Sequence, residues 1–133
     1  MKDWKGFAKQ SWRRASLTLG TARRVLPHDP DSASNRAYYA AFHAVTAFFA
    51  LQGKSFSKHG SVEAAVHRDL VHAKVWPVEL GQAYTNLVHA RYTGDYGGFV
   101  HVTKEEARDA IDSAERILKA VHDACPDSFP WED

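Results

Sequence analysis

At residues 34–43 the sequence reads SNRAYYAAFH, inside a segment from Ser32 to Leu51 that is apolar nearly all round a helix. A helix that is apolar on every side is buried among other elements, so this segment predicts the central helix of the fold. Arg36 and His43 are two of its few polar residues. Seven residues make about two helical turns, so both side chains fall on one stripe, roughly 20° apart around the axis and about 10 Å apart along it.

The segments on both sides of this helix also have helical spacing. Apolar residues recur every three or four positions over about residues 2–26, 61–73, 78–92 and 103–121, whereas the alternation typical of strands is almost absent. Two prolines separate the first two segments, Gly53 and Gly94 are the expected stops of the second and fourth helices, and Thr103 with Glu106 forms a capping-box pattern. The sequence therefore predicts an all-α fold.

Length and composition fit one globular domain. The chain has 133 residues, of which 44% are hydrophobic and 25% charged, which excludes disordered and fibrous classes. We expect residues 1–125 to form a single helical bundle and residues 126–133, which are polar and broken by proline, to be a loosely attached tail. A single cysteine, Cys125, and the lack of an apolar leader or membrane span predict a cytoplasmic protein that does not contact the membrane.

Charge is distributed unevenly along the chain. Residues 1–26 contain seven Lys or Arg and one Asp, whereas residues 103–133 contain four Lys or Arg and nine Asp or Glu. A basic first helix can follow a phosphate backbone, lie against the acidic last helix, or form a solvated face. We favour the solvated face, because the basic residues are spread around the helix.

Three groups of residues carry a resemblance to a known family. The string from Ala33 to Ala44, then Gly53 with Lys58-His59, and later RYTGDY at residues 91–96 resemble the HEPN domain family, the "higher eukaryotes and prokaryotes nucleotide-binding" helical domains. The likeness covers about residues 30–121. It implies an up-and-down four-helix bundle with one additional short helix, a homodimer, and often a minimal nucleotidyltransferase as partner. Many members are metal-independent endoribonucleases or toxins.

The resemblance also suggests a catalytic pair. The family's nuclease signature is an Arg and a His separated by four to six residues, and Arg36 and His43 have six between them. His43 would take a proton from a ribose 2′-hydroxyl, and Arg36 would stabilise the negative charge that builds on the phosphate. Two departures from the family pattern are the apolar Ala37 after the arginine and the position of the pair in the second helix. In the alternative, Arg36 pairs with Asp31 or Asp95, and His43 is a hydrogen-bonded core histidine.

The segment 91–96 occupies the place where the family motif usually lies. It has Asp95 where a nuclease histidine would stand, and Arg91 with Asp95 has the spacing of a helix-end ion pair. In related toxin pairs a tyrosine in this region is nucleotidylated by the partner, and Tyr96 is the corresponding candidate. We expect Arg91, Asp95 and Tyr96 to fold back beside Arg36, so we take them as a candidate nucleotide- or RNA-binding group.

Three further candidates for nucleotide or RNA binding lie in and after the central helix. Tyr39 can stack on a base, although an aromatic core residue is the more common case. Lys58 and His59 can reach a phosphate or a partner's acidic edge from their connector, or form a solvated loop. No histidine spacing suits a metal site, and we expect no cofactor. Three functions stay open: an RNA-cleaving enzyme or toxin, a non-catalytic nucleotide- or RNA-binding module beside a nucleotidyltransferase, and a bundle that only dimerises or docks a partner.

Overall fold

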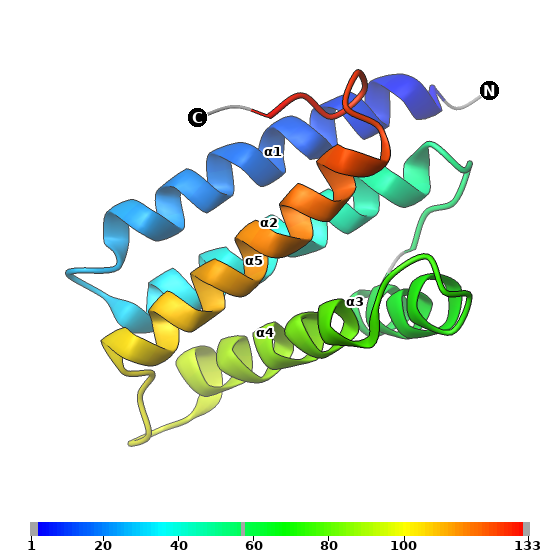
Figure 1. The fold of residues 1–133 in the computed structure, drawn as a ribbon. Helices are drawn as coiled ribbons and strands as arrows, with labels where there is room; N and C mark the ends of the chain where they lie inside the picture. Colours follow the sequence, from blue (N-terminus) through cyan, green and yellow to red (C-terminus); the bar gives the residue numbers. More distant parts are fainter. Residues whose placement is uncertain (1–2, 57, 132–133) are drawn as a thin grey trace.

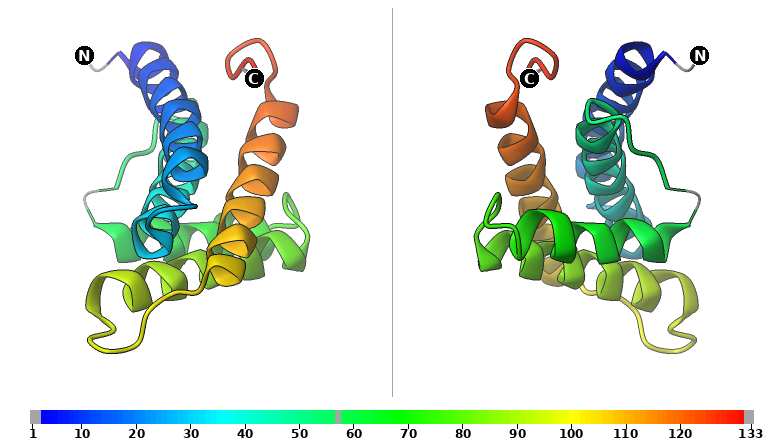
Figure 2. Two further views of the ribbon diagram at one scale, coloured as in Figure 1. Left: turned by 90° about the vertical axis from the view of Figure 1, so that its left-hand side faces the viewer. Right: turned by 90° about the vertical axis from the view of Figure 1, so that its right-hand side faces the viewer.

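The computed structural model describes residues 3–56 and 58–131, which form helices and connecting turns without a strand (Figure 1). The elements are α1 (Trp4–Val25), α2 (Pro30–Ala50), α3 (His59–Ala65), a π-helical turn η1 (Val66–Val71), α4 (Val78–Tyr96) and α5 (Lys104–Ala124). Four long helices and a short additional one confirm the predicted all-α bundle. Helix α4 runs obliquely to α1, α2 and α5 (Figure 2).

Helix α2 is the central element, as its sequence predicts. It packs against α1, α4 and α5 and touches α3. Besides Tyr38, Val45 and Phe49, its buried side contains alanines that are completely inaccessible to solvent: Ala33, Ala37, Ala40, Ala41, Ala44, Ala47 and Ala50. Because a methyl group projects little from the helix, the neighbouring backbones approach α2 closely, and the larger core side chains come mainly from the partners.

Side-chain caps fix three of the helix starts. Asp3 accepts a hydrogen bond from the Gly6 amide at the start of α1, and Asp29 accepts one from the Ser32 amide at the start of α2. Pro30 occupies the first turn of α2, where a missing amide proton costs nothing. At the start of α5, Thr103 and Glu106 form the predicted reciprocal capping box.

Two helix boundaries differ from the sequence prediction. Helix α4 continues through Gly94 to Tyr96, whereas we predicted that it stops at this glycine. A Cβ atom at position 94 would lie 2.9 Å from the carbonyl oxygen of Asp31, so the glycine permits close packing of α4 on the start of α2. The predicted helix over 61–73 is divided into α3 and η1, where the His72 amide donates to the carbonyl of His67, five residues back.

The C-terminal tail corrects another expectation. We predicted that residues 126–133 are loosely attached, but the part that the structure describes, up to Trp131, is packed against α1 and α5. Phe129 is fully buried, and its ring centroid lies 5.4 Å from that of Trp12. The Trp12 indole donates a 2.8 Å hydrogen bond to the carbonyl of Pro130. The buried Phe129 ring therefore holds the tail against the helices, although most residues of the tail are polar. Residues 132–133 lie outside the described part.

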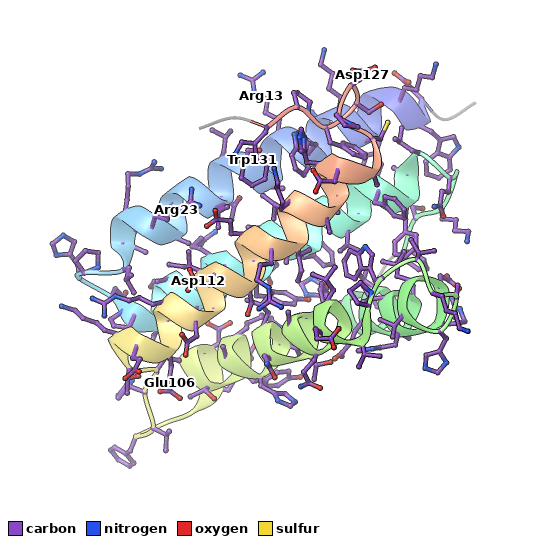
Figure 3. All side chains as sticks on the ribbon, in the orientation of Figure 1. Arg13, Arg23, Glu106, Asp112, Asp127 and Trp131 are labelled. Carbon is purple, nitrogen blue, oxygen red and sulfur yellow. The ribbon has the colours of Figure 1, made fainter. Side chains whose placement is uncertain are left out.

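The basic and acidic helices meet at one point that the structure shows. Arg23 of α1 forms a 3.0 Å ion pair with Glu115 of α5. At this position the basic first helix lies against the acidic last helix, which was one of the three alternatives for its charged side chains. Other charged side chains of α1 and α5 lie at the surface (Figure 3). Among the described residues, no helix combines the length and the apolar character needed to cross a bilayer.

Candidate functional site

Tyr39 of α2 lies at the centre of the candidate site. Its ring centroid is 5.1 Å from that of Tyr38, 6.2 Å from that of His43 and 5.5 Å from that of His59 on α3. The Cζ atom of Arg91, on α4, lies 5.5 Å from the Tyr39 ring centroid. We call these five residues the Tyr39 cluster. Three separate helices bring them together.

The helical repeat of α2 and one hydrogen bond hold the cluster in place. Tyr39 and His43 are four residues apart, so they are neighbours on one face of α2. The Tyr38 hydroxyl is 3.1 Å from Nδ1 of His59, which ties the start of α3 to α2. The imidazole of His59 also stacks on Phe42, with 4.6 Å between ring centroids. His59 is therefore the first residue of α3 and packs against α2, whereas the sequence placed it in a connector.

Arg91 approaches the cluster from α4 and carries the predicted ion pair. Its Nε atom lies 3.5 Å from Oδ2 of Asp95, and the two side chains are 17% and 27% exposed. Its guanidinium also lies over the rings of Tyr38 at 5.3 Å and Tyr92 at 5.9 Å. Nε is buried and has no hydrogen bond among the described residues. The cation is thus largely desolvated, supported by aromatic faces and paired with one carboxylate, and its Nε has no hydrogen bond in the described part.

Asn35 is a site residue that sequence reasoning did not single out. Its side-chain amide donates to both carboxylate oxygens of Asp95, at 2.9 and 3.2 Å, and so joins α2 to α4. The sequence feature that could have indicated Asn35 is its position four residues before Tyr39, which places both side chains on the same face of the helix. The bond fixes Asp95, which in turn fixes Arg91.

The carboxylates proposed as alternative partners of Arg36 bind other groups. Asp95 contacts Asn35 and Arg91, whereas Asp31 accepts hydrogen bonds from the Val102 amide and from Nδ1 of His101. Arg36 is exposed, and in the described part of the chain no carboxylate lies within ion-pair distance of it. The predicted Arg36 ion pair is therefore not formed.

Comparison with known proteins adds to this geometry. A family model described as the HEPN domain matches residues 8–124. A "UPF0332 protein" of Thermotoga maritima is 41% identical over 110 residues, which cover 82% of this chain and 83% of that protein. The chain belongs to the HEPN domain family. This confirms the resemblance found in the sequence, and the match extends it backwards into α1. At the level of the family, the HEPN domain is a nucleotide-binding or ribonuclease-like module.

Two imidazoles of this HEPN domain are held in the neutral form. Burial, with smaller effects of Arg14 and His59, lowers the pKa of His43 to about 4. Burial and the Arg91 cation lower the pKa of His59. At neutral pH the His43 ring is therefore uncharged, and its burial opposes the uptake of a second proton.

The remaining predicted residues lie at the margins of the HEPN site. Arg36 is exposed on α2, one turn before Tyr39, and Lys58 is exposed next to His59. Tyr96 is 67% exposed, and its ring centroid lies 5.5 Å from that of Tyr92. The structure thus joins Tyr39, His43, His59, Arg91 and Asp95, whereas it leaves Arg36, Lys58 and Tyr96 without a contact to the cluster centre. In the part of the chain that the structure describes, no three His, Cys, Asp or Glu side chains gather in a way that suits a metal ion.

Proposed function

We propose that this HEPN domain binds single-stranded RNA at the Tyr39 cluster, with Tyr39 against a base and Arg91 against a phosphate. The observation that carries this proposal is the position of the Arg91 guanidinium, which is desolvated and has no hydrogen bond at Nε among the described residues, beside a half-buried tyrosine ring. Proteins that bind single strands combine cationic groups for the backbone with aromatic faces for the bases.

The surroundings of the cluster support RNA as the ligand. Arg36 and Lys58 are exposed cations next to Tyr39 and His59, so positive charge borders the aromatic centre along α2 and at the start of α3. The neutral imidazole of His59 offers a hydrogen-bonding edge without adding charge. A free nucleotide presents the same base and phosphate and would bind more weakly, because it engages fewer of these groups.

Binding of a fluorescently labelled single-stranded RNA, measured by polarisation, tests this proposal. Replacing Tyr39 by Leu keeps an apolar side chain in the packing but removes the ring, so we expect at least about tenfold weaker binding. Arg36→Gln should weaken binding of all sequences and reduce its salt dependence. Arg116→Gln, an exposed change on α5, is the matched control and should bind as the unmodified protein does. Equal affinity of Tyr39→Leu and the unmodified protein would contradict the proposed site.

Metal-independent RNA cleavage is the second candidate function, supported by membership of the HEPN family and by the position of His43 beside Tyr39. In this reaction His43 takes the proton from a ribose 2′-hydroxyl, the oxygen attacks the adjacent phosphorus, and the 5′-oxygen leaves, which gives a 2′,3′-cyclic phosphate. Arg36 would stabilise the charge on the phosphate oxygens. The RNA would have to span the two helical turns between these residues.

Cleavage in the presence of EDTA distinguishes this candidate from binding alone. We expect the unmodified protein to cut single-stranded RNA under these conditions, and His43→Gln to lose cleavage while it still binds. A His43→Gln protein that cuts as fast as the unmodified one would refute the catalytic role. Binding without any cleavage would leave the non-catalytic module as the function.

Assembly and a toxin role are further proposals for the same molecule. Tyr92, Tyr96, Phe99 and Val100 are more than half exposed at the end of α4 and in the following loop, and they offer an apolar area for a homodimer or for a nucleotidyltransferase partner. The exposed side chain of Tyr96 is accessible to such an enzyme.

Light scattering of the unmodified protein and of Phe99→Ser tests whether this area forms a dimer. A tight complex with a partner protein, without RNA binding, would instead favour a bundle that only docks a partner. Cytoplasmic location stays a prediction of the sequence.

A further inference from the structure

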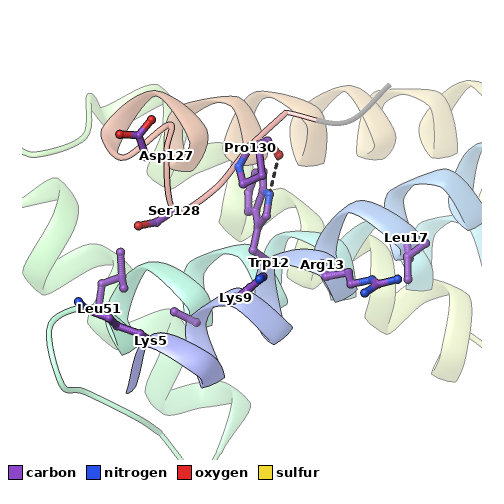
Figure 4. A pocket seen from close by; sticks show the side chains of 10 residues that line it. Lys5, Lys9, Trp12, Arg13, Leu17, Leu51, Asp127, Ser128 and Pro130 are labelled. Atoms are coloured by element: carbon purple, nitrogen blue, oxygen red, sulfur yellow. Dashed lines mark hydrogen bonds between the residues drawn. The ribbon is translucent and has the colours of Figure 1, made fainter. Parts of the chain in front are cut away.

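A pocket of about 670 Å³ opens between α1, the end of α2 and the C-terminal tail (Figure 4). It has no lining residue in common with the Tyr39 cluster. Its apolar surface comes from Ala8, Trp12, Leu17, Leu51 and Pro130. This volume lies in the range of pockets that bind small organic ligands, which are commonly lined by apolar groups with a few polar ones.

The polar part of the pocket is mostly cationic. Lys5, Lys9 and Arg13 follow one another at intervals of four residues, so they form a row along one side of α1. Among the described lining residues, Asp127 in the tail supplies the one carboxylate. Among the described residues, no carboxylate lies within 4.0 Å of any of the three cations.

The arrangement of this row favours an added anion. Like charges four residues apart on a helix repel each other. A bound anion would relieve this repulsion, whereas a neutral ligand would not.

We propose that this pocket binds a small amphipathic anion, which consists of one carboxylate or phosphate group on an apolar body. The head group would lie along Lys5, Lys9 and Arg13, and the body would cover Trp12, Leu51 and Pro130. The lining does not suit a nucleobase, because Trp12 is its one aromatic residue among those described and is only 3% exposed. This site is independent of the proposed RNA function.

Isothermal titration of the full chain with octanoate and octyl phosphate tests the proposal. We expect binding of at least one of the two, and their comparison shows which head group is preferred. Octyl glucoside, which has the same chain and no charge, and acetate, which has the charge and no chain, should each bind at least about tenfold more weakly. Equal binding of octanoate and octyl glucoside would overturn the anionic head group.

Two double variants locate the binding. Lys9→Ala with Arg13→Ala removes part of the cationic row, and we expect about a tenfold or greater loss of affinity for the anion. Arg108→Ala with Arg116→Ala removes two exposed cations from α5 and should leave affinity unchanged. If both double variants bind equally well, the anion binds elsewhere and the proposal fails.

The Trp12 indole supplies a second measurement that does not depend on the variants. Its N–H signal in a proton–nitrogen NMR spectrum should shift on addition of octanoate, whereas that of Trp76, which does not line the pocket, should not. An unchanged Trp12 signal at saturating octanoate would contradict the site.

An acidic amphipathic peptide serves as a competitor. If it binds more tightly than either octyl anion at the same cations, the pocket is a protein-docking site and the small-ligand proposal is wrong.

Discussion

His43 shows how position alone determines the chemistry of a side chain. The same residue type is exposed at His89 on α4, whereas His43 is half-buried between aromatic rings and close to Arg14 of α1. Burial and neighbouring positive charge both penalise the protonated ring. The residue that the sequence presented as a catalytic candidate is therefore also a residue on which stability depends.

We expect His43 to make the protein less stable in weak acid. Its pKa is about 4 in the folded protein and 6.5 in the reference state, so between these values the unfolded chain binds more protons. The free energy of unfolding should be unaffected above pH 6.5 and should fall by about 2 kcal/mol as the pH is lowered to 4, allowing for partial exposure. Urea unfolding at a series of pH values measures this change.

Two substitutions separate this effect from general acid unfolding. His43→Gln cannot titrate, so it should flatten the pH dependence between pH 6.5 and 4. His89→Gln, on the exposed side of α4, should retain the dependence of the unmodified protein. Identical pH profiles for His43→Gln and the unmodified protein would show that His43 is not the group responsible.

The sequence predicts individual site residues better than their contacts. Helical spacing placed Arg36 and His43 on one stripe of the second helix and predicted the ion pair of Arg91 with Asp95. It could not show that Asn35 binds Asp95, because that contact joins residues 60 positions apart and depends on how α4 crosses α2. The Arg36 ion pairs were predicted from nearby opposite charge, but Asp31 binds the Val102 amide instead.

At the scale of helices, small residues determine how closely two elements approach. Gly94 lies against the backbone of Asp31, at the point where α4 meets the start of α2. Gly20 also lies inside a helix, but a Cβ atom there would meet only the end of the Arg24 side chain, at 3.3 Å. The two glycines therefore have different roles, although both interrupt a helical sequence.

Alanine substitution at these two glycines should change stability in opposite directions. Alanine favours a helix by about 1 kcal/mol over glycine, so Gly20→Ala should raise the free energy of unfolding by about 0.5–1 kcal/mol. In Gly94→Ala the contact with the Asp31 backbone cannot relax easily, and we expect a net loss of about 1–2 kcal/mol. Chemical denaturation checks both values, and a stabilised Gly94→Ala protein would mean that α4 does not pack this closely.

The sequence predicted where the helices lie, but it did not predict where all of them end. The capping box at Thr103 was predicted because both of its partners lie within one turn. The end of α4 was not predicted, because a glycine can either stop a helix or permit close packing. The position of the Asp31 backbone decides that Gly94 has the second role. The π-helical turn η1 has no distinct residue pattern in this chain.

For the whole molecule, the tail joins the last helix to the first. Phe129 is fully buried against Trp12, and Nδ1 of His122 lies 2.6 Å from the carbonyl of Phe129. The sequence suggested a loose tail because prolines and acidic residues dominate its composition. A single buried ring in a short polar segment is a tertiary effect that composition does not reveal.

Loss of this ring should destabilise the entire domain. We expect Phe129→Ala to reduce the free energy of unfolding by about 3–5 kcal/mol, the usual effect of removing a buried aromatic side chain. Asp127→Asn, an exposed change two residues away, should have little effect on the same measurement. An unfolding midpoint of Phe129→Ala equal to that of the unmodified protein would indicate that the tail does not contribute to the core.

The tail also affects how the protein emerges during synthesis. The hydrogen bond from Trp12 to Pro130 joins residues 118 positions apart, so the side of α1 that carries Trp12 stays uncovered until residue 130 has left the ribosome. A stalled nascent chain that ends within α5 would expose this indole to chaperones and proteases. Emergence of residue 130 is therefore the step at which the newly made chain can first complete this part of its core.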